Sequence, residues 1–154
     1  MQTKASVLGT PVHPALVHFP LGLWLTSFVT DVLFYLTRNS SLLLVSKFLI
    51  AAGLIGGIAA AIPGFIDWWT LKDGPLKRIA DWHARLNFIA LALFAGSLYL
   101  RIKHLGAPLV NYRIRIPFLV SLIGVVLVGI AANLGGEMVY KHRMGVAEEL
   151  RNQR

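Results

Sequence analysis

The chain contains no cysteine among its 154 residues. This absence excludes disulfide bonds, thiolate metal ligands, iron–sulfur clusters and haem attached through thioether bonds. Any metal or haem would therefore depend on the side chains of His, Asp, Glu or Met. Charged residues are also scarce, at 14% of the chain against roughly 25% in an average soluble domain, whereas hydrophobic residues reach 56%.

The apolar residues are concentrated in four long stretches that almost lack charge. These stretches cover about residues 14–36, 48–66, 82–102 and 116–138. Each is close to the roughly 20 residues that a helix needs to cross about 30 Å of hydrocarbon. A chain inside lipid must be helical to satisfy its own backbone, so we expect one transmembrane domain over residues 1–154 with four helical spans.

The connections between these stretches are short. Residues 38–41, 63–75 and 106–108 join consecutive spans, and short connections make consecutive helices antiparallel neighbours. The sequence therefore predicts an all-α, integral membrane four-helix bundle with up-down-up-down topology. We find no internal repeat in the sequence.

Up-down-up-down topology brings most of the polar residues to one end of the bundle. Four of the five histidines belong to this end, and only His104 belongs to the other. The polar residues expected to converge are His13, His18, His83, His142, Asp67, Trp68, Asp81, Asn87 and Glu137.

Convergent histidines favour ligation, since neutral imidazole binds haem iron and transition metals, and a histidine pair on facing helices is a common haem clamp. We expect haem b with His18 and His83 as its axial pair, and His13 or His142 as the alternate or supporting residue. The alternative cofactor is a non-haem transition metal with Asp67 or Glu137 as further ligands.

Other residues at this end are expected to support the ligands. Asn87, Asp81 and Trp68 are predicted to orient the imidazoles by hydrogen bonding, and Asn87 shares a helix face with His83 because it lies four residues away. A proton relay through histidines and carboxylates stays open. So does a plain interpretation, in which polar residues collect at a bundle end because headgroups and water are there.

One acidic residue falls deep in the first span. Asp31 lies in its second half, where a charge is costly. We expect it to reach the interface along the helix end near Arg38, with pairing to Lys47 or Arg101 as the other option.

The net charge of +8 indicates loops held against anionic lipid headgroups. The basic residues are divided among several short loops, and no recognisable nucleic-acid-binding module accompanies them. We therefore expect the lipid bilayer, and no nucleic acid, as a partner.

Four segments resemble those of a known family. They are residues 13–20 (HPALVHFP), 64–68 (GFIDW), 83–87 (HARLN) and 135–142 (GGEMVYKH). In this order they are similar to the motifs of a bacterial membrane family catalogued as domain of unknown function 2231, across essentially the whole chain. The resemblance implies four helices in the bacterial inner (cytoplasmic) membrane. It also implies a link to redox chemistry through the fused partners of some members.

Two functions from different classes follow. The first is a membrane electron-transfer protein that binds haem or a metal and works with a redox partner protein. The second is a structural or accessory membrane subunit, or an oligomeric scaffold, that packs through Gly and Ala faces such as that of Gly56 and Gly57 and carries no cofactor.

Overall fold

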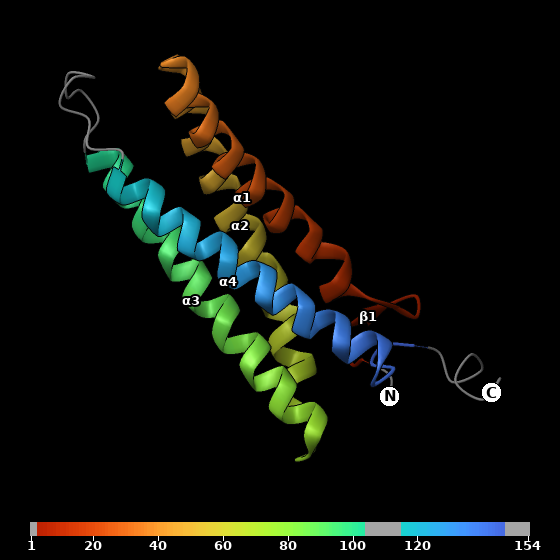
Figure 1. Cartoon of the computed structure of the whole chain (residues 1–154). Coiled ribbons are helices and arrows are strands. Elements are labelled where there is room, and N and C mark those ends of the chain that lie inside the picture. The colour runs from red at the N-terminus through yellow and green to blue at the C-terminus, as the bar shows by residue number, and fades with distance from the viewer. Residues whose placement is uncertain (1–2, 104–114, 147–154) are drawn as a thin grey trace.

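A computed structural model describes residues 3–103 and 115–146 and contains four long helices and one small hairpin of strands (Figure 1). The strands are β1 (Ser6–Val7) and β2 (Thr10–Pro11), and the helices are α1 (Val12–Thr37), α2 (Ser41–Trp69), α3 (Pro75–Lys103) and α4 (Arg115–Tyr140). All four helices are long and apolar enough to cross a membrane, which confirms the predicted four-helix membrane bundle. The strands were not expected, and His104 and the connection at 106–108 lie outside the described residues.

The connection between α2 and α3 is shorter than predicted. Pro63 and Gly64 lie inside α2, which continues to Trp69 before a turn that covers residues 70–74. Proline is tolerated inside a membrane helix because neighbouring helices and small local adjustments satisfy the backbone groups that it frees. The Pro–Gly pair is therefore a packing feature of the second helix and does not end it.

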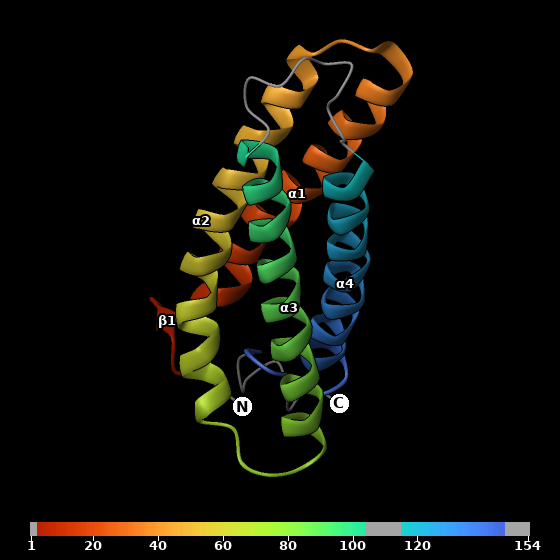
Figure 2. The ribbon, with the colours of Figure 1, turned by 90° about the vertical axis from the view of Figure 1, so that its left-hand side faces the viewer.

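The four helices form two antiparallel hairpins. Helix α1 packs mainly against α2, and α3 packs mainly against α4, whereas contacts between the hairpins are sparse, and α1 and α4 make fewer of them than α2 and α3. Helices α1 and α3 run in the same direction and lie diagonally across the bundle, with β1 and the end of α4 at the same end of the molecule (Figures 1 and 2).

The two hairpins are structural repeats, although the sequence alone does not reveal it. Adding 70 to a residue number in α1 gives the equivalent position in α3, and adding 71 to one in α2 gives the equivalent position in α4. Buried positions match by this rule, with the pairs Pro20/Ala90, Trp24/Phe94, Ser27/Ser97, Asp31/Arg101, Ser46/Pro117, Ile50/Ser121, Gly53/Gly124 and Ala60/Ala131. The expectation of no internal repeat is therefore wrong at the level of structure, because what repeats is the pattern of buried positions.

Aromatic stacking fills the centre of the bundle. The rings of Trp24 and Phe94 lie 4.4 Å apart and within 9° of parallel, across the space between α1 and α3. Each ring packs on a glycine of its own hairpin, since a Cβ at Gly53 would overlap the Trp24 ring and one at Gly124 would meet Phe94 at 2.9 Å. These glycines thus let each hairpin close around a large ring.

A buried ion pair joins the two hairpins near the other end. Arg101 donates from Nη1 to Asp31 Oδ1 at 2.8 Å and from Nη2 to Oδ2 at 2.5 Å, and both side chains are fully buried. Its remaining N–H groups face the hydroxyl groups of three serines, which are Ser46, Ser97 and Ser121. The expectation that Asp31 reaches the interface is therefore wrong, because a bidentate cation meets it inside the bundle.

Candidate functional site

Two histidines occupy equivalent positions in the two hairpins and make the same hydrogen bond. His13 Nδ1 lies 2.8 Å from the carbonyl oxygen of Ala60, and His83 Nδ1 lies 2.8 Å from that of Ala131. A carbonyl oxygen only accepts, so each Nδ1 carries the donated proton. In the neutral ring this leaves the Nε2 lone pair of both histidines available to a ligand.

A glycine lies against each imidazole. A Cβ at Gly64 would meet His13 Nδ1 at 2.7 Å, and a Cβ at Gly135 would meet His83 Cε1 at 3.2 Å. Each glycine follows the carbonyl acceptor by four residues on the same helix, so acceptor and glycine share one face. The second helix of each hairpin thus fixes both the position and the tautomer of the histidine on the first.

The two imidazoles lie next to each other, one from each hairpin, in an edge-on arrangement. Their ring centres are 6.0 Å apart and their planes are 86° from parallel. The acceptors Ala60 and Ala131 precede the first carboxylates on their helices, Asp67 and Glu137, by seven and six residues. At 1.5 Å per residue the pair lies about 10 Å inside those charged positions, deeper than the membrane surface where it was expected.

Asn87 lies beside His83, as the spacing of four residues predicted. Its amide nitrogen is 3.1 Å from His83 Nε2 and donates to the His83 backbone oxygen at 2.8 Å. The Asn87 amide therefore donates a hydrogen bond to the Nε2 lone pair of His83 in this structure. A metal ligated by His83 would take the place of this hydrogen bond.

The other two histidines lie apart from the pair. His18 follows His13 by five residues, which turns it by about 140° around α1, and it is exposed. His142 lies beyond the end of α4 and is half-buried, and its backbone N–H donates to the oxygen of Glu137. The structure thus brings His13, and not His18, to His83.

The carboxylates expected as ligands have other partners. Asp67 is buried and accepts the backbone N–H of Ala5 at 2.9 Å, which ties the β-hairpin to α2. Glu137 forms an ion pair of 3.0 Å with Lys141 on the surface. Within residues 3–103 and 115–146, no three His, Asp or Glu side chains gather closely enough to hold a metal ion, so the predicted cluster around Asp67 and Glu137 is not formed there.

Trp68 and Asp81 bind each other and make no hydrogen bond to the histidines among the described residues. Trp68 Nε1 donates to Asp81 Oδ1 at 2.7 Å, and Lys77 Nζ lies 3.6 Å from the Trp68 ring centre. Lys77 also donates to the Trp68 backbone oxygen at 3.0 Å and lies 3.7 Å from Asp81. This cluster holds the turn between α2 and α3.

Sequence reasoning missed the partners that position the histidines. Ala60, Ala131, Gly64 and Gly135 carry no functional group, so composition gives them no weight. The signal that could have found them is the spacing between repeats, since both the alanine pair and the glycine pair differ by 71 residues.

Four membrane-spanning helices with a histidine pair inside the bundle define a multi-pass membrane protein whose polar centre lies between two helical hairpins. The chain belongs to the family described as "Predicted membrane protein (DUF2231)", which it matches over residues 9–148. No curated protein and no solved structure matches the chain.

Proposed function

We propose that this protein binds a redox-active metal centre between His13 and His83 and transfers electrons in the bacterial inner membrane. The observation that supports this function is the separation of the two rings, 6.0 Å between centres. A metal bonded to two imidazoles at about 2 Å per bond sets the ring centres roughly 5 Å apart when the bonds are bent and 6 Å when they are straight. The pair thus has a spacing at which one metal could join both rings.

Haem b is the centre that fits this donor set better than a non-haem metal. The haem of electron-transfer proteins is commonly held by two protein side chains, and bundles commonly supply them as histidines from facing helices. A structural zinc site or a non-haem iron site takes three or more protein ligands, and the described residues provide no such group. Bound at this pair, haem would supply one-electron transfer, and the chain would set its potential through burial and dipoles.

Binding of a porphyrin would also require space. The hollow on the outer face of α3 and α4 is lined by residues such as Trp82 and Leu134 and includes neither histidine. A porphyrin between the rings would therefore need the hairpins to move apart and Asn87 to release His83. Sparse contacts between the hairpins favour such a movement, and the glycines beside the histidines keep nearby backbone free of bulk.

The second function is a structural or accessory subunit without cofactor. The hydrogen bonds themselves support it, since each histidine joins two helices of its hairpin and Asn87 fills the remaining lone pair of His83. Such bonds contribute about 0.6 kcal/mol on average to membrane helix association. Under this function the protein would associate with a membrane partner or with a second copy of itself.

An absorption spectrum with elemental analysis of the protein purified in detergent tests the proposal. We expect a Soret band and about one iron per chain, both lost in His83→Ala. Asn87→Ala should retain the band with a shifted reduction potential, because it changes the surroundings of His83 and leaves the imidazole in place.

A colourless protein without bound transition metal, prepared from haem-replete and metal-replete cells, would contradict the proposal and favour the structural function. A colourless protein with about one non-haem metal per chain, lost in His83→Ala, would replace haem with a two-histidine metal site.

A further inference from the structure

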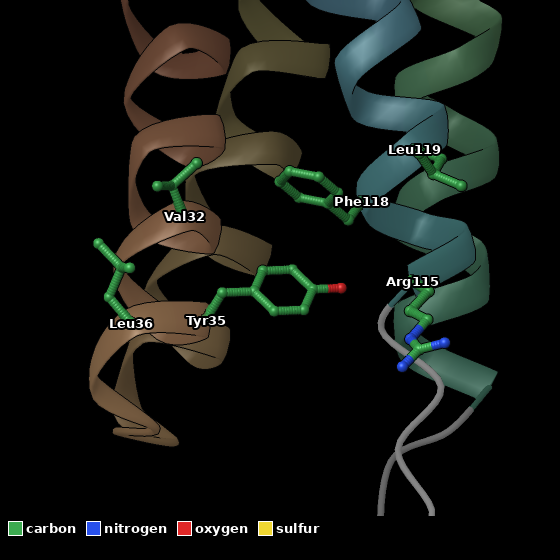
Figure 3. A pocket seen from close by; sticks show the side chains of 6 residues that line it. All are labelled: Val32, Tyr35, Leu36, Arg115, Phe118 and Leu119. Carbon is green, nitrogen blue, oxygen red and sulfur yellow. The ribbon is translucent and has the colours of Figure 1, made fainter.

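A hollow lies between α1 and α4 at the end of the bundle opposite to the histidine pair, in the seam where Phe28 and Tyr35 of α1 pack against Phe118 of α4. It has a volume of about 380 Å³, and its lining residues are Val32, Tyr35, Leu36, Arg115, Phe118 and Leu119 (Figure 3). Among neighbouring helices this pair makes the fewest contacts, so the backbones stand apart here. A hollow lined by apolar side chains on the lipid-facing side of a bundle is filled by lipid in a bilayer.

Two aromatic rings, those of Tyr35 and Phe118, line this hollow, and a third ring, Phe28, packs against Phe118. Phe118 of α4 stacks on Phe28 at 5.2 Å and meets Tyr35 edge-on at 5.1 Å between ring centres, both on α1. Figure 3 shows the Tyr35 hydroxyl directed across the hollow toward the helix that carries Arg115. The hollow therefore combines an apolar floor with a hydroxyl group and a guanidinium group at its interfacial edge.

The excess of basic over acidic residues at this end of the bundle favours an anionic partner. The sequence has no Asp or Glu from residue 32 to 66 or from 82 to 136, so both loops of this end are free of acids. The one acid nearby, Asp31, is committed to Arg101. Besides Arg101, five basic residues belong to this end of the bundle, and they are Arg38, Lys47, Lys103, Arg113 and Arg115.

The repeat relationship shows that the hollow is particular to one side of the bundle. The position equivalent to Arg115 in the first hairpin is Leu44, and that equivalent to Phe118 is Lys47. The guanidinium group of Arg115 and the ring of Phe118 are thus features that the second hairpin has at these positions and the first hairpin lacks. A hairpin can pack without an arginine and a phenylalanine at these two positions, because the first hairpin has Leu44 and Lys47 there.

We propose that this hollow is a site for an anionic phospholipid, with an acyl chain on the aromatic floor and the headgroup phosphate paired with Arg115. Arginine binds phosphate in a bidentate manner, and tyrosine at an interface combines an apolar body with a polar tip. The proposal stands independently of any cofactor at the histidine pair.

Spin-labelled lipids in vesicles that contain the purified protein test the site. The electron paramagnetic resonance spectrum gives the affinity of labelled phosphatidylglycerol relative to labelled phosphatidylcholine. We expect selectivity for phosphatidylglycerol in the unaltered protein, and a decrease of about fivefold in Arg115→Ala, the factor that one basic residue near a membrane surface contributes. Arg115→Lys should retain part of the selectivity, since it keeps the charge and loses the bidentate fork.

Two further variants separate a site from general attraction by charge. Lys103→Ala removes one positive charge at the same end from a residue that does not line the hollow, and it should leave most of the selectivity intact. Leu119→Trp fills the hollow without changing the charge and should lower the selectivity. An equal loss in Lys103→Ala and Arg115→Ala, or an unchanged selectivity in Leu119→Trp, would overturn the proposal, as would equal affinity for both lipids.

Discussion

Asp31 and Arg101 occupy equivalent positions in the two hairpins, yet they carry opposite charges and bind each other. Each lies four residues after a buried serine, Ser27 in α1 and Ser97 in α3. Two copies of one hairpin would place like charges against each other in a low-dielectric interior, which is strongly unfavourable. The pair therefore favours association of the first hairpin with the second over association of either hairpin with its own copy.

Removing one partner of this pair should destabilise the protein strongly. Asp31→Asn leaves the Arg101 charge buried without compensation, and we expect a loss of about 3–5 kcal/mol in the free energy of unfolding. Unfolding by a denaturing detergent in mixed micelles, followed by circular dichroism, measures it. Glu137→Gln is the control, because it breaks the surface pair with Lys141 and should cost less than about 1 kcal/mol.

The same measurement tests the equivalence of the two positions. Arg101→Asp alone should fail to fold or lose more stability than Asp31→Asn, since two carboxylates would then meet. The double variant Asp31→Arg/Arg101→Asp should recover part of that loss, because it restores opposite charges and each position lies four residues after a buried serine. A double variant as unstable as Arg101→Asp would mean that the two environments are not equivalent.

A methyl group at Gly53 should disturb the centre of the bundle. In Gly53→Ala the new Cβ would overlap Trp24 Nε1, and the stack on Phe94 limits how far the indole can move. Overpacking of this kind costs about 1–3 kcal/mol. Gly129→Ala is the matched control in a helix of the same kind, since nothing lies within 4 Å of its Cβ, and it should keep or slightly raise the stability.

Cysteine substitution can test the contact between the hairpins directly, because the chain has no cysteine of its own. His13→Cys/His83→Cys should become cross-linked by a short bifunctional thiol reagent, since the two side chains lie next to each other, one from each hairpin. The control His18→Cys/His83→Cys should not, because His18 lies on the exposed side of α1. Mass spectrometry of peptides after proteolysis identifies the cross-link, and efficient cross-linking only through position 18 would contradict the arrangement.

The sequence predicted the number and direction of the helices because hydrophobic length and short connections decide both. Residues such as Asp31 and His18 could not be placed in this way, since their environment depends on how each helix is rotated about its own axis. The low amphipathicity of membrane helices hides this rotation, because lipid-facing and buried side chains are both apolar. Asp31 was therefore expected at the interface, whereas its partner lies 70 residues away on the diagonal helix.

The sequence also predicted the end of the bundle at which the histidines lie, but it did not predict that His13 is the partner of His83. His18 looks more central than His13 in the sequence because it lies inside the apolar stretch of residues 14–36, whereas His13 lies just before it. The β-hairpin covers the start of α1 instead, and it is held by the bond between Ala5 and Asp67. This lets the first turn of α1 sit at the depth of Ala60 and face His83.

The most direct test of the central claim is the amount of tightly bound iron or other transition metal per chain in four single variants, His13→Ala, His18→Ala, His83→Ala and His142→Ala. If His13 and His83 share a metal centre, their variants should lose bound metal together, whereas the variants of exposed His18 and of His142 should retain it. Loss through His18→Ala with retention in His13→Ala would contradict the pairing, and equal metal content near zero in all four and in the unaltered protein would contradict the metal centre itself.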